Sequence, residues 1–318
     1  MVRKILGFGS LGTPKRHGSV ISKEQLDQLL ELEPRRHRLT DPSWHNLSWS
    51  ALREPYDEST DWSVNFPFFE TYGPAFDEYC RALADSPPID RTPFERNDGT
   101  RVKYTFLKDT TQEQLDDIGT WIDLIGHYVG IRDFLRVSFA LDYTCEAGNP
   151  DNSRTKIARL RQEAKLYGAK DSPSTETLAA ASRLAVACVK FIEQSKSYFS
   201  ANAVIAVPRS DPSKKYSLPA FIAERIAQDL PFADLSESVK TTTARQEMKD
   251  TPADKRLSAL EGTIGVLDTE AVKGKRILIV DDLYQSGTTM NYVGMLLLEA
   301  GASCVYGLAC EKTCSNQD

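Results

Sequence analysis

The chain has 318 residues, of which 41% are hydrophobic and 26% are charged, an ordinary balance for a folded globular protein with one large or two smaller domains. Its formal net charge of −6 argues against attraction of nucleic acid over the whole surface, but it does not exclude a local basic patch. No run of about 18 apolar residues occurs, so we expect no membrane-spanning helix. The six cysteines form no C-x-x-C pair, which excludes the usual zinc-site spacing and makes a reducing cytoplasm the simplest location.

Residues 1–135 are predicted to form a separate domain that is mainly helical and irregular. Ser22-Lys-Glu-Gln25 is a capping box that starts a short helix. Residues 40–75 lack hydrophobic periodicity, and residues 84–100 have the composition of a polar linker. A second helix is predicted from Thr110 to Val129, because apolar residues recur there at helical spacing.

Residues 136–318 show alternating strand and helix patterns. We expect strands at Val137–Tyr143, Val204–Val207 and Ile277–Val280, and helices at 155–167, from Ser174 through Ile192, at Leu218–Leu230 and from Ser286 to Gly301. The first of these strands is expected at the edge of the sheet. Such alternation predicts an α/β fold with a doubly wound parallel sheet, in which ligands bind at the carboxyl ends of the strands.

The strongest candidate site follows the apolar strand Ile277–Val280. Two adjacent carboxylates, Asp281 and Asp282, come where this strand ends, and Ser286-Gly-Thr-Thr289 then opens a helix. Backbone N–H groups at a helix N-terminus hold anions. The carboxylates can accept hydrogen bonds from sugar hydroxyls or face a hydrated Mg²⁺. Together these groups predict a site for a phosphorylated sugar.

Two further segments carry positive charge that suits a polyanionic ligand. Arg209 and Ser210 follow the strand Val204–Val207, and Lys214 and Lys215 come shortly after; several donors of this kind suit a pyrophosphate group. The polar segment 240–256 lacks periodicity and is predicted to be a mobile loop. For both segments, an ordinary exposed charged loop remains the alternative.

The segment Val280-Asp-Asp-Leu-Tyr-Gln-Ser-Gly-Thr-Thr289 resembles the phosphoribosyl-pyrophosphate (PRPP) motif of type I phosphoribosyltransferases. The surrounding chain looks most like the ComF-type, competence-associated branch, without the N-terminal zinc module that many of its members carry. The resemblance implies that Asp281 and Asp282 act in catalysis by binding the ribose hydroxyls and, through water, Mg²⁺. It implies that Gln285, Ser286, Gly287, Thr288 and Thr289 bind the 5′-phosphate.

The same resemblance implies that a basic loop closes over PRPP and that Lys240 and Arg256 of this loop act in catalysis. Its Arg…Thr…Gln…Arg pattern is matched by Lys240, Thr243, Gln246 and Arg256. Arg209, Ser210, Lys214 and Lys215 occupy the place of the pyrophosphate-binding residues. The implied partner is PRPP or a nucleotide 5′-phosphate, and the implied reaction transfers a phosphoribosyl group to or from an unknown acceptor.

Two alternative functions remain open at the level of the sequence. The chain could be a non-catalytic regulator that binds PRPP or a nucleotide, or an interaction protein in DNA uptake, DNA processing or phage defence. The basic residues near the N-terminus, among them Arg35, Arg36 and Arg38, motivate the nucleic-acid alternative. Residues before 136 are the candidate for a hood over the acceptor or for a partner-binding unit, and a homodimer is open as well.

Overall fold

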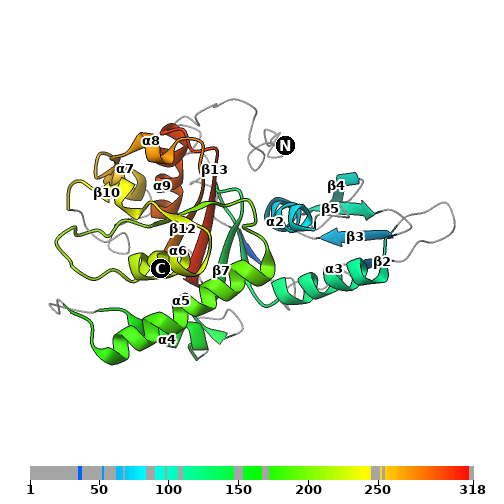
Figure 1. Ribbon diagram of the computed structural model, residues 1–318, viewed down its shortest axis with the longest axis horizontal. Helices are drawn as coiled ribbons and strands as arrows, with labels where there is room; N and C mark the ends of the chain where they lie inside the picture. Colours follow the sequence, from blue (N-terminus) through cyan, green and yellow to red (C-terminus); the bar gives the residue numbers. More distant parts are fainter. Residues whose placement is uncertain are drawn as a thin grey trace.

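The structure is a computed structural model, which describes residues 35–37, 52–53, 62–66, 69–83, 90–96, 99–106, 110–146, 153–166, 172–244, 251–252 and 255–314 (Figure 1). The α/β part holds the strands β6 (Val129–Arg132), β7 (Ser138–Tyr143), β8 (Ala203–Ala206), β9 (Ala233–Asp234), β10 (Val239–Thr241), β11 (Ile264–Val266), β12 (Arg276–Tyr284) and β13 (Cys304–Lys312). Its helices are α4 (Lys156–Ala164), α5 (Thr175–Ser195), α6 (Leu218–Asp229), α7 (Arg256–Leu260), α8 (Thr269–Val272) and α9 (Thr288–Glu299), with a 3₁₀ turn at Ser236–Ser238.

The main sheet has seven strands in the order β1-β6-β7-β13-β12-β8-β9, where β1 is Arg35–His37. The strands from β7 to β9 run parallel, and β1 and β6 extend the sheet in antiparallel fashion. The predicted doubly wound parallel sheet is therefore confirmed. The prediction that Val137–Tyr143 forms an edge strand is wrong, because β7 has β6 on one side and β13 on the other.

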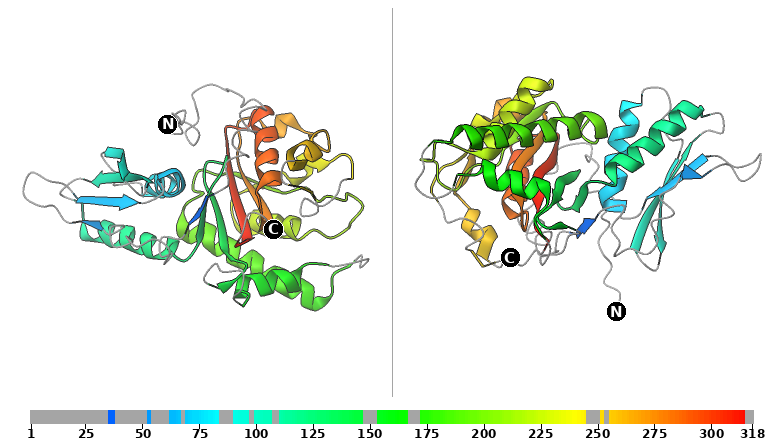
Figure 2. Two further views of the ribbon diagram at one scale, coloured as in Figure 1. Left: turned by 180° about the vertical axis from the view of Figure 1, so that it is seen from behind. Right: turned by 90° about the horizontal axis from the view of Figure 1, so that it is seen from below.

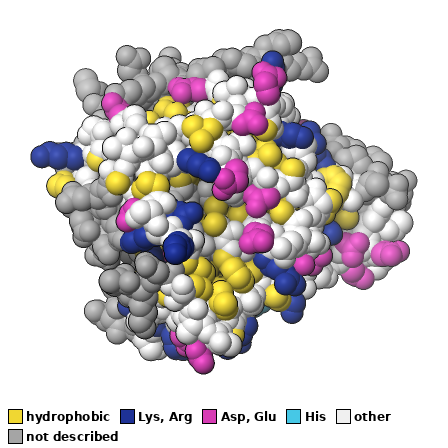
Figure 3. Space-filling model, turned by 60° about the vertical axis from the view of Figure 1, so that its left-hand side comes forward, with side chains coloured by type: hydrophobic (Ala, Val, Ile, Leu, Met, Phe, Trp, Pro, Cys, Tyr) yellow, Lys and Arg dark blue, Asp and Glu magenta, His cyan; other side chains and the backbone are white. Residues whose placement is uncertain are grey.

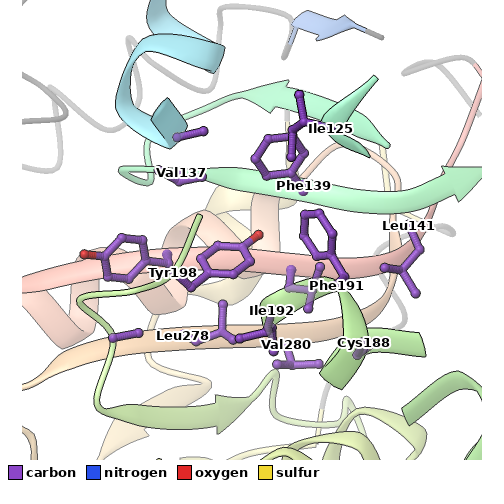
Figure 4. Packing of buried hydrophobic residues seen from close by; sticks show 14 of the residues in the cluster. Ile125, Val137, Phe139, Leu141, Cys188, Phe191, Ile192, Tyr198, Leu278 and Val280 are labelled. Atoms are coloured by element: carbon purple, nitrogen blue, oxygen red, sulfur yellow. The ribbon is translucent and has the colours of Figure 1, made fainter. Parts of the chain in front are cut away.

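The central strand β12 is buried on both faces, as its continuous apolar run predicts. Leu278 and Val280 belong to the cluster under α5 and α6, and Figure 4 shows them beside the α5 residues Cys188, Phe191 and Ile192. Ile277 and Ile279 face the opposite cluster, which includes Val293 and Leu297 of α9. Alternate residues of one strand thus hold two helical layers to one sheet.

Side-chain caps determine where the predicted helices begin. Thr111 caps α3 (Gln112–Ile125) through a capping box with Gln114, so this helix starts two residues after the predicted Thr110 and ends before Val129. Thr155 and Ser174 cap α4 and α5, as the sequence indicates. Each cap satisfies a backbone N–H that the helix itself leaves without a partner.

The N-terminal part contains a sheet that the sequence analysis did not predict. Its four antiparallel strands follow the order β2 (Leu52–Arg53), β3 (Trp62–Phe66), β5 (Gly99–Phe106) and β4 (Asp90–Arg96). The helices α2 (Phe69–Ala82) and α3 accompany it in a lobe beside the α/β part (Figure 2). The linker predicted at 84–100 is wrong for residues 90–96 and 99–100, which form β4 and the start of β5 in a β-hairpin. The alternation of buried Val102, Tyr104 and Phe106 with polar residues is the signal that could have revealed it.

The lobe is attached at the amino ends of the parallel strands. Glu78 of α2 is fully buried and accepts hydrogen bonds from Arg136 Nε at 3.1 Å, Tyr306 Oη at 3.2 Å and Ser200 N at 3.0 Å. Arg136 precedes β7, Ser200 precedes β8, and Tyr306 lies near the start of β13. Trp121 of α3 donates to the carbonyl of the last residue of α5 at 2.6 Å. These contacts lie at the amino ends of the parallel strands, whereas the predicted ligand site lies at their carboxyl ends.

Some predictions fall outside what the structure decides. The helix after Ser22 lies outside the described residues. The division into residues 1–135 and 136–318 stays a prediction, as does a hood formed by the first of these; β6, which precedes residue 136, is a strand of the main sheet. Within the described part of the chain, no helix is long and apolar enough to cross a membrane.

Candidate functional site

Asp281 and Asp282 lie near the carboxyl end of β12, beside the switch point at which the strand order of the sheet reverses. From β12 the chain passes through α9 to β13 on one side, whereas from β8 it passes through α6 to β9 on the other. The carboxyl ends of β8 and β12 therefore flank the switch point, where ligands bind in sheets of this kind. The loop after β8 starts beside β12, because Val207 N donates to the Val280 carbonyl at 2.9 Å.

Asp282 is held by two cations from α4. Its Oδ2 atom lies 3.2 Å from Lys165 Nζ and 3.3 Å from an Arg161 Nη atom. Arg161 Nε also donates to Glu311 at 2.5 Å, and Glu311 accepts a further bond from Thr144 at 2.8 Å. Burial alone would raise the pKa of Asp282, but the charges of Lys165 and Arg161 outweigh it and lower the pKa. Asp282 is therefore an ionised and neutralised carboxylate.

Asp281 has a different environment from its neighbour. It is half-buried, and its Oδ1 atom accepts the backbone N–H of Asp282 at 2.8 Å. Burial and then the negative charge of Asp282 raise the pKa of Asp281 to about 8. The two adjacent carboxylates are thus driven apart in pKa, which is a common feature of functional sites. Among the described residues, Asp282 forms ion pairs with Arg161 and Lys165, whereas Asp281 forms none.

The predicted 5′-phosphate loop, Gln285–Thr289, forms the turn between β12 and α9. Gly287 has a positive φ of 74° and is the N-cap of α9. A Cβ atom at this position would lie 2.1 Å from Tyr284 Oη, so only glycine fits without a shift. Ser286 Oγ and Thr288 Oγ1 lie 2.8 Å apart. Hydroxyls and the first N–H groups of a helix therefore meet at one point, where they could hold an anion.

A buried polar network supports this loop from beneath. Tyr284 Oη donates to Asp133 at 2.9 Å and accepts from Asn291 Nδ2 at 3.1 Å. The same amide nitrogen donates to the Gly287 carbonyl at 2.8 Å, and Asn291 Oδ1 accepts from Phe134 N at 3.0 Å. Burial raises the pKa of Asp133 to about 6, although its hydrogen bonds oppose the rise. The network fixes the backbone of the loop before any ligand is present.

Lys312, the last residue of β13, supports the same loop from the side. Its side chain is fully buried, and Nζ donates to the Gln285 carbonyl at 3.1 Å and to the Thr313 carbonyl at 3.1 Å. The ammonium also lies 5.8 Å from the centre of the Tyr284 ring. A buried positive charge bonded to the loop backbone both restrains the loop and makes the electrostatic potential there more favourable for an anion.

The predicted pyrophosphate residues lie in two places along the segment from β8 to α6. Arg209 and Ser210 lie in the loop that follows β8 at the switch point, and Arg209 is exposed. The Arg209 carbonyl accepts a bond from Thr241 Oγ1 at 2.5 Å, which joins this loop to β10. Lys214 and Lys215 are exposed in the turn before α6. The geometry brings Arg209 and Ser210 next to the end of β12, and the two lysines further along the same segment.

Lys240 and Arg256 lie at the two ends of the segment that was predicted to be a mobile loop. Lys240 is part of β10 and pairs with Glu237 on the surface. Arg256 starts α7, is buried, and donates through Nε to the Thr251 carbonyl at 3.0 Å. Both ends of the segment are thus ordered by secondary structure. The catalytic role of either residue stays a prediction.

Sequence reasoning missed the residues that surround the acidic pair. Arg161 is on α4 and Lys165 is the C-cap residue four positions later; two basic residues so close together at the end of a helix are the signal that could have drawn attention to them. Glu311 and Lys312 interrupt the apolar run of β13 where that strand ends. Charged residues at the carboxyl end of a buried strand are unusual unless they serve a site or pair with each other.

The donor atoms at this site suit Mg²⁺ in one particular mode. Among the described residues, no group of three or more His, Cys, Asp or Glu side chains could hold a metal by itself. Mg²⁺ is, however, commonly held by one or two carboxylates, several waters and the phosphates of a substrate. Asp281, with its half-buried carboxylate at the switch point, offers a ligand of this type. The residues therefore fit a metal that arrives together with a phosphorylated ligand.

A comparison with known protein families supports the resemblance of this region to phosphoribosyltransferases. Residues 216–310 match the phosphoribosyl transferase domain family. The match runs from the end of the predicted pyrophosphate segment through the acidic pair and the phosphate loop into β13. No curated protein matches the chain.

Proposed function

We propose that the protein binds PRPP, or a related ribose 5-phosphate ligand, together with Mg²⁺, and transfers the phosphoribosyl group to or from an acceptor. One observation carries the proposal: the acidic pair and the preformed phosphate loop occur at the carboxyl end of one strand, within a match to the phosphoribosyl transferase domain family. The finer assignment to the ComF-type branch is part of the proposal and rests on the sequence resemblance.

In this proposal each part of the site acts on one part of the ligand. The 5′-phosphate would accept hydrogen bonds from Ser286, Thr288 and the first N–H groups of α9. Asp281 would accept hydrogen bonds from the ribose hydroxyls, and its ionised form, which a bound cation favours, would stabilise the positive charge that develops at C1′. Arg209 and Ser210 would bind the diphosphate. Mg²⁺, when bound, would neutralise the charge of this leaving group.

Binding is tested by isothermal titration calorimetry with PRPP and with ribose 5-phosphate, in Mg²⁺ and in EDTA. We expect PRPP to bind in Mg²⁺ and to bind at least about 10-fold more weakly in EDTA, because the metal shields the diphosphate. The double variant Asp281→Asn, Asp282→Asn should lose this binding. Asp229→Asn, which changes a carboxylate in an exposed helical ion pair, is the matched control. Unchanged affinity in the double variant would refute the site assignment.

Catalysis is tested separately from binding. Release of pyrophosphate is measured with PRPP, Mg²⁺ and a panel of purine and pyrimidine bases, and the reverse reaction is measured with nucleoside 5′-monophosphates and pyrophosphate. Turnover with any acceptor supports a phosphoribosyltransferase. Tight, metal-dependent PRPP binding without turnover would instead favour the non-catalytic regulator.

The remaining hypotheses concern partners and location. On the face shown in Figure 3, basic and acidic side chains of the described residues are interspersed, a distribution that favours small-ligand chemistry over binding to a polyanion on that face. Salt-dependent DNA binding that is lost on charge reversal at Arg35, Arg36 and Arg38 would support the nucleic-acid alternative. A homodimer, which light scattering would detect, and a cytoplasmic location stay hypotheses.

A further inference from the structure

The C-terminal end of α4 lies between the acidic pair and the segment before α6. On one side, Lys165 Nζ is 3.2 Å from Asp282 Oδ2. On the other side, Tyr216 Oη donates to the carbonyl of Ala164 at 2.9 Å. Burial and the nearby charge of Asp282 raise the pKa of Tyr216 to about 12, which agrees with the closeness of Tyr216 to the acidic pair. Lys165 therefore stands where β12, α4 and the Lys214–Ser217 segment meet.

The two cations that hold Asp282 differ in how firmly they are held. The Arg161 side chain is 9% exposed and bonds to Glu311 at 2.5 Å as well as to Asp282. The Lys165 side chain is 37% exposed, and its described partner is Asp282. It belongs to the C-cap residue of α4, beyond the last helical turn. A half-exposed ion pair with a flexible lysine contributes little to stability, so the ammonium can change partners easily.

A change of partner by Lys165 would leave Arg161 as the shared cation of two carboxylates, Asp282 and Glu311. Asp282 would keep Arg161, whose position is fixed by Glu311. The released ammonium would remain within reach of the switch point and of the segment before α6. A phosphate group attracts an ammonium more strongly than a carboxylate that is already paired, because the phosphate carries more charge. The geometry thus provides a cation that is neutralised without ligand and available when a polyanion arrives.

We propose that Lys165 binds the diphosphate group of the ligand, exchanging Asp282 for it, while Arg161 continues to neutralise Asp282. This inference rests on the proposed function and identifies a diphosphate-binding residue outside the matched family region of residues 216–310. It predicts that Lys165 discriminates between ligands with a diphosphate and ligands that carry the 5′-phosphate alone.

The test compares three ligands in Mg²⁺ by calorimetry: PRPP, inorganic pyrophosphate and ribose 5-phosphate. Lys165→Gln should weaken PRPP and pyrophosphate binding by about 10- to 100-fold, the value of one hydrogen bond to a charged group, and leave ribose 5-phosphate within about 3-fold. Arg183→Gln removes another cation near α4, which pairs with Glu163 on the surface at 3.5 Å. This control should bind all three ligands as the wild type does.

Several outcomes would overturn the inference. Equal losses for all three ligands would show that Lys165 acts only by holding Asp282, and no loss for any ligand would show that it has no role in binding. Lys165→Arg provides a second variant that keeps the charge if the glutamine variant does not fold; it should retain the preference for PRPP over ribose 5-phosphate within about 10-fold. If the wild type binds none of the three ligands, the proposed function itself fails. If the wild type binds them and Lys165→Gln binds them as Arg183→Gln does, only the role of Lys165 fails.

Discussion

Replacement of Asp281 by asparagine should stabilise the ligand-free protein while it removes ligand affinity. The raised pKa of Asp281, about 8, means that at alkaline pH the folded chain holds a charge that burial and Asp282 disfavour. Asparagine lacks this charge, and its side-chain oxygen can still accept the Asp282 N–H that lies 2.8 Å from Oδ1. A functional carboxylate that lowers stability is a known consequence of building a charged site.

The expected gain follows from the size of the pKa difference and from exposure. A rise from an ordinary aspartate pKa to about 8 corresponds to about 6 kcal/mol if it is counted in full. Asp281 is half-buried, so water screens much of this energy. We therefore expect a gain of about 1–2 kcal/mol at about pH 8, or a few degrees in Tm.

The gain should depend on pH in a defined direction. Between about pH 4 and about pH 8 the folded chain keeps the Asp281 proton that the unfolded chain has released, so this group makes wild-type stability fall as pH rises. The advantage of Asp281→Asn should grow over the same range and vanish near its acid end. Urea unfolding at about pH 5, about pH 6.5 and about pH 8 measures it.

Asp282→Asn is the matched substitution and should have the opposite sign. The lowered pKa of Asp282 means that its ionised form adds stability above the ordinary aspartate pKa, and that this stability is lost as pH falls through the folded pKa. Asparagine would leave the buried Arg161 facing a neutral amide, at a cost of about 2–3 kcal/mol at neutral pH. If both variants shifted stability in the same direction at about pH 8, the unequal roles of the two carboxylates would be refuted.

Three further predictions concern the loop and the lobe. Gly287→Ala should destabilise the protein by about 2–4 kcal/mol and abolish ribose 5-phosphate binding, because the new Cβ would lie 2.1 Å from the Tyr284 oxygen. The control Gly262→Ala, at a φ of 66° with open space around it, should lose only about 1 kcal/mol and keep binding. Equal effects of the two substitutions in thermal unfolding and calorimetry would contradict the packing argument. Lys312→Met should weaken ribose 5-phosphate binding by about 10-fold or more, since it removes a buried cation and a bond to the loop backbone. Calorimetry at two salt concentrations measures the affinity, and an unchanged affinity would show that Lys312 does not support the site. Glu78→Gln should lower the free energy of unfolding by about 3 kcal/mol, because the buried Arg136 no longer faces the negative charge of Glu78. Arg225→Ala removes one member of an exposed ion pair and should have no measurable effect; equal urea midpoints for the two variants would argue against this attachment of the lobe.

Much of the α/β part was predictable because its signals are local. Ser174 caps α5 in the structure as its position before the apolar pattern indicates. The apolar run of β12 predicted a strand buried on both faces, and the structure confirms it. Each of these features depends on residues within one or two turns of each other, so a single sequence carries enough information to locate them.

Other elements were misjudged where local composition and tertiary pairing disagree. Residues 90–96 contain a proline and several charges, which favour a linker, yet they form the outer strand of a hairpin. Proline and charge are tolerated there because β4 is an edge strand of its sheet. The place of β7 inside the sheet was also hidden, since it follows from β6 and β13 pairing on either side.

The local sequence of β12 and α9 specifies the acidic pair, the glycine turn and the helix N-terminus, since these groups are neighbours in the chain. Their charges, however, depend on residues far away in sequence. Lys165 and Arg161 reach Asp282 across 117 and 121 residues, and Arg161 meets Glu311 across 150. Which side chains meet at such distances follows from strand order and helix packing, because periodicity describes only the face that a residue takes and not the partner that it finds there. The difference between Asp281 and Asp282, on which the proposed chemistry depends, therefore arises only when the chain is folded.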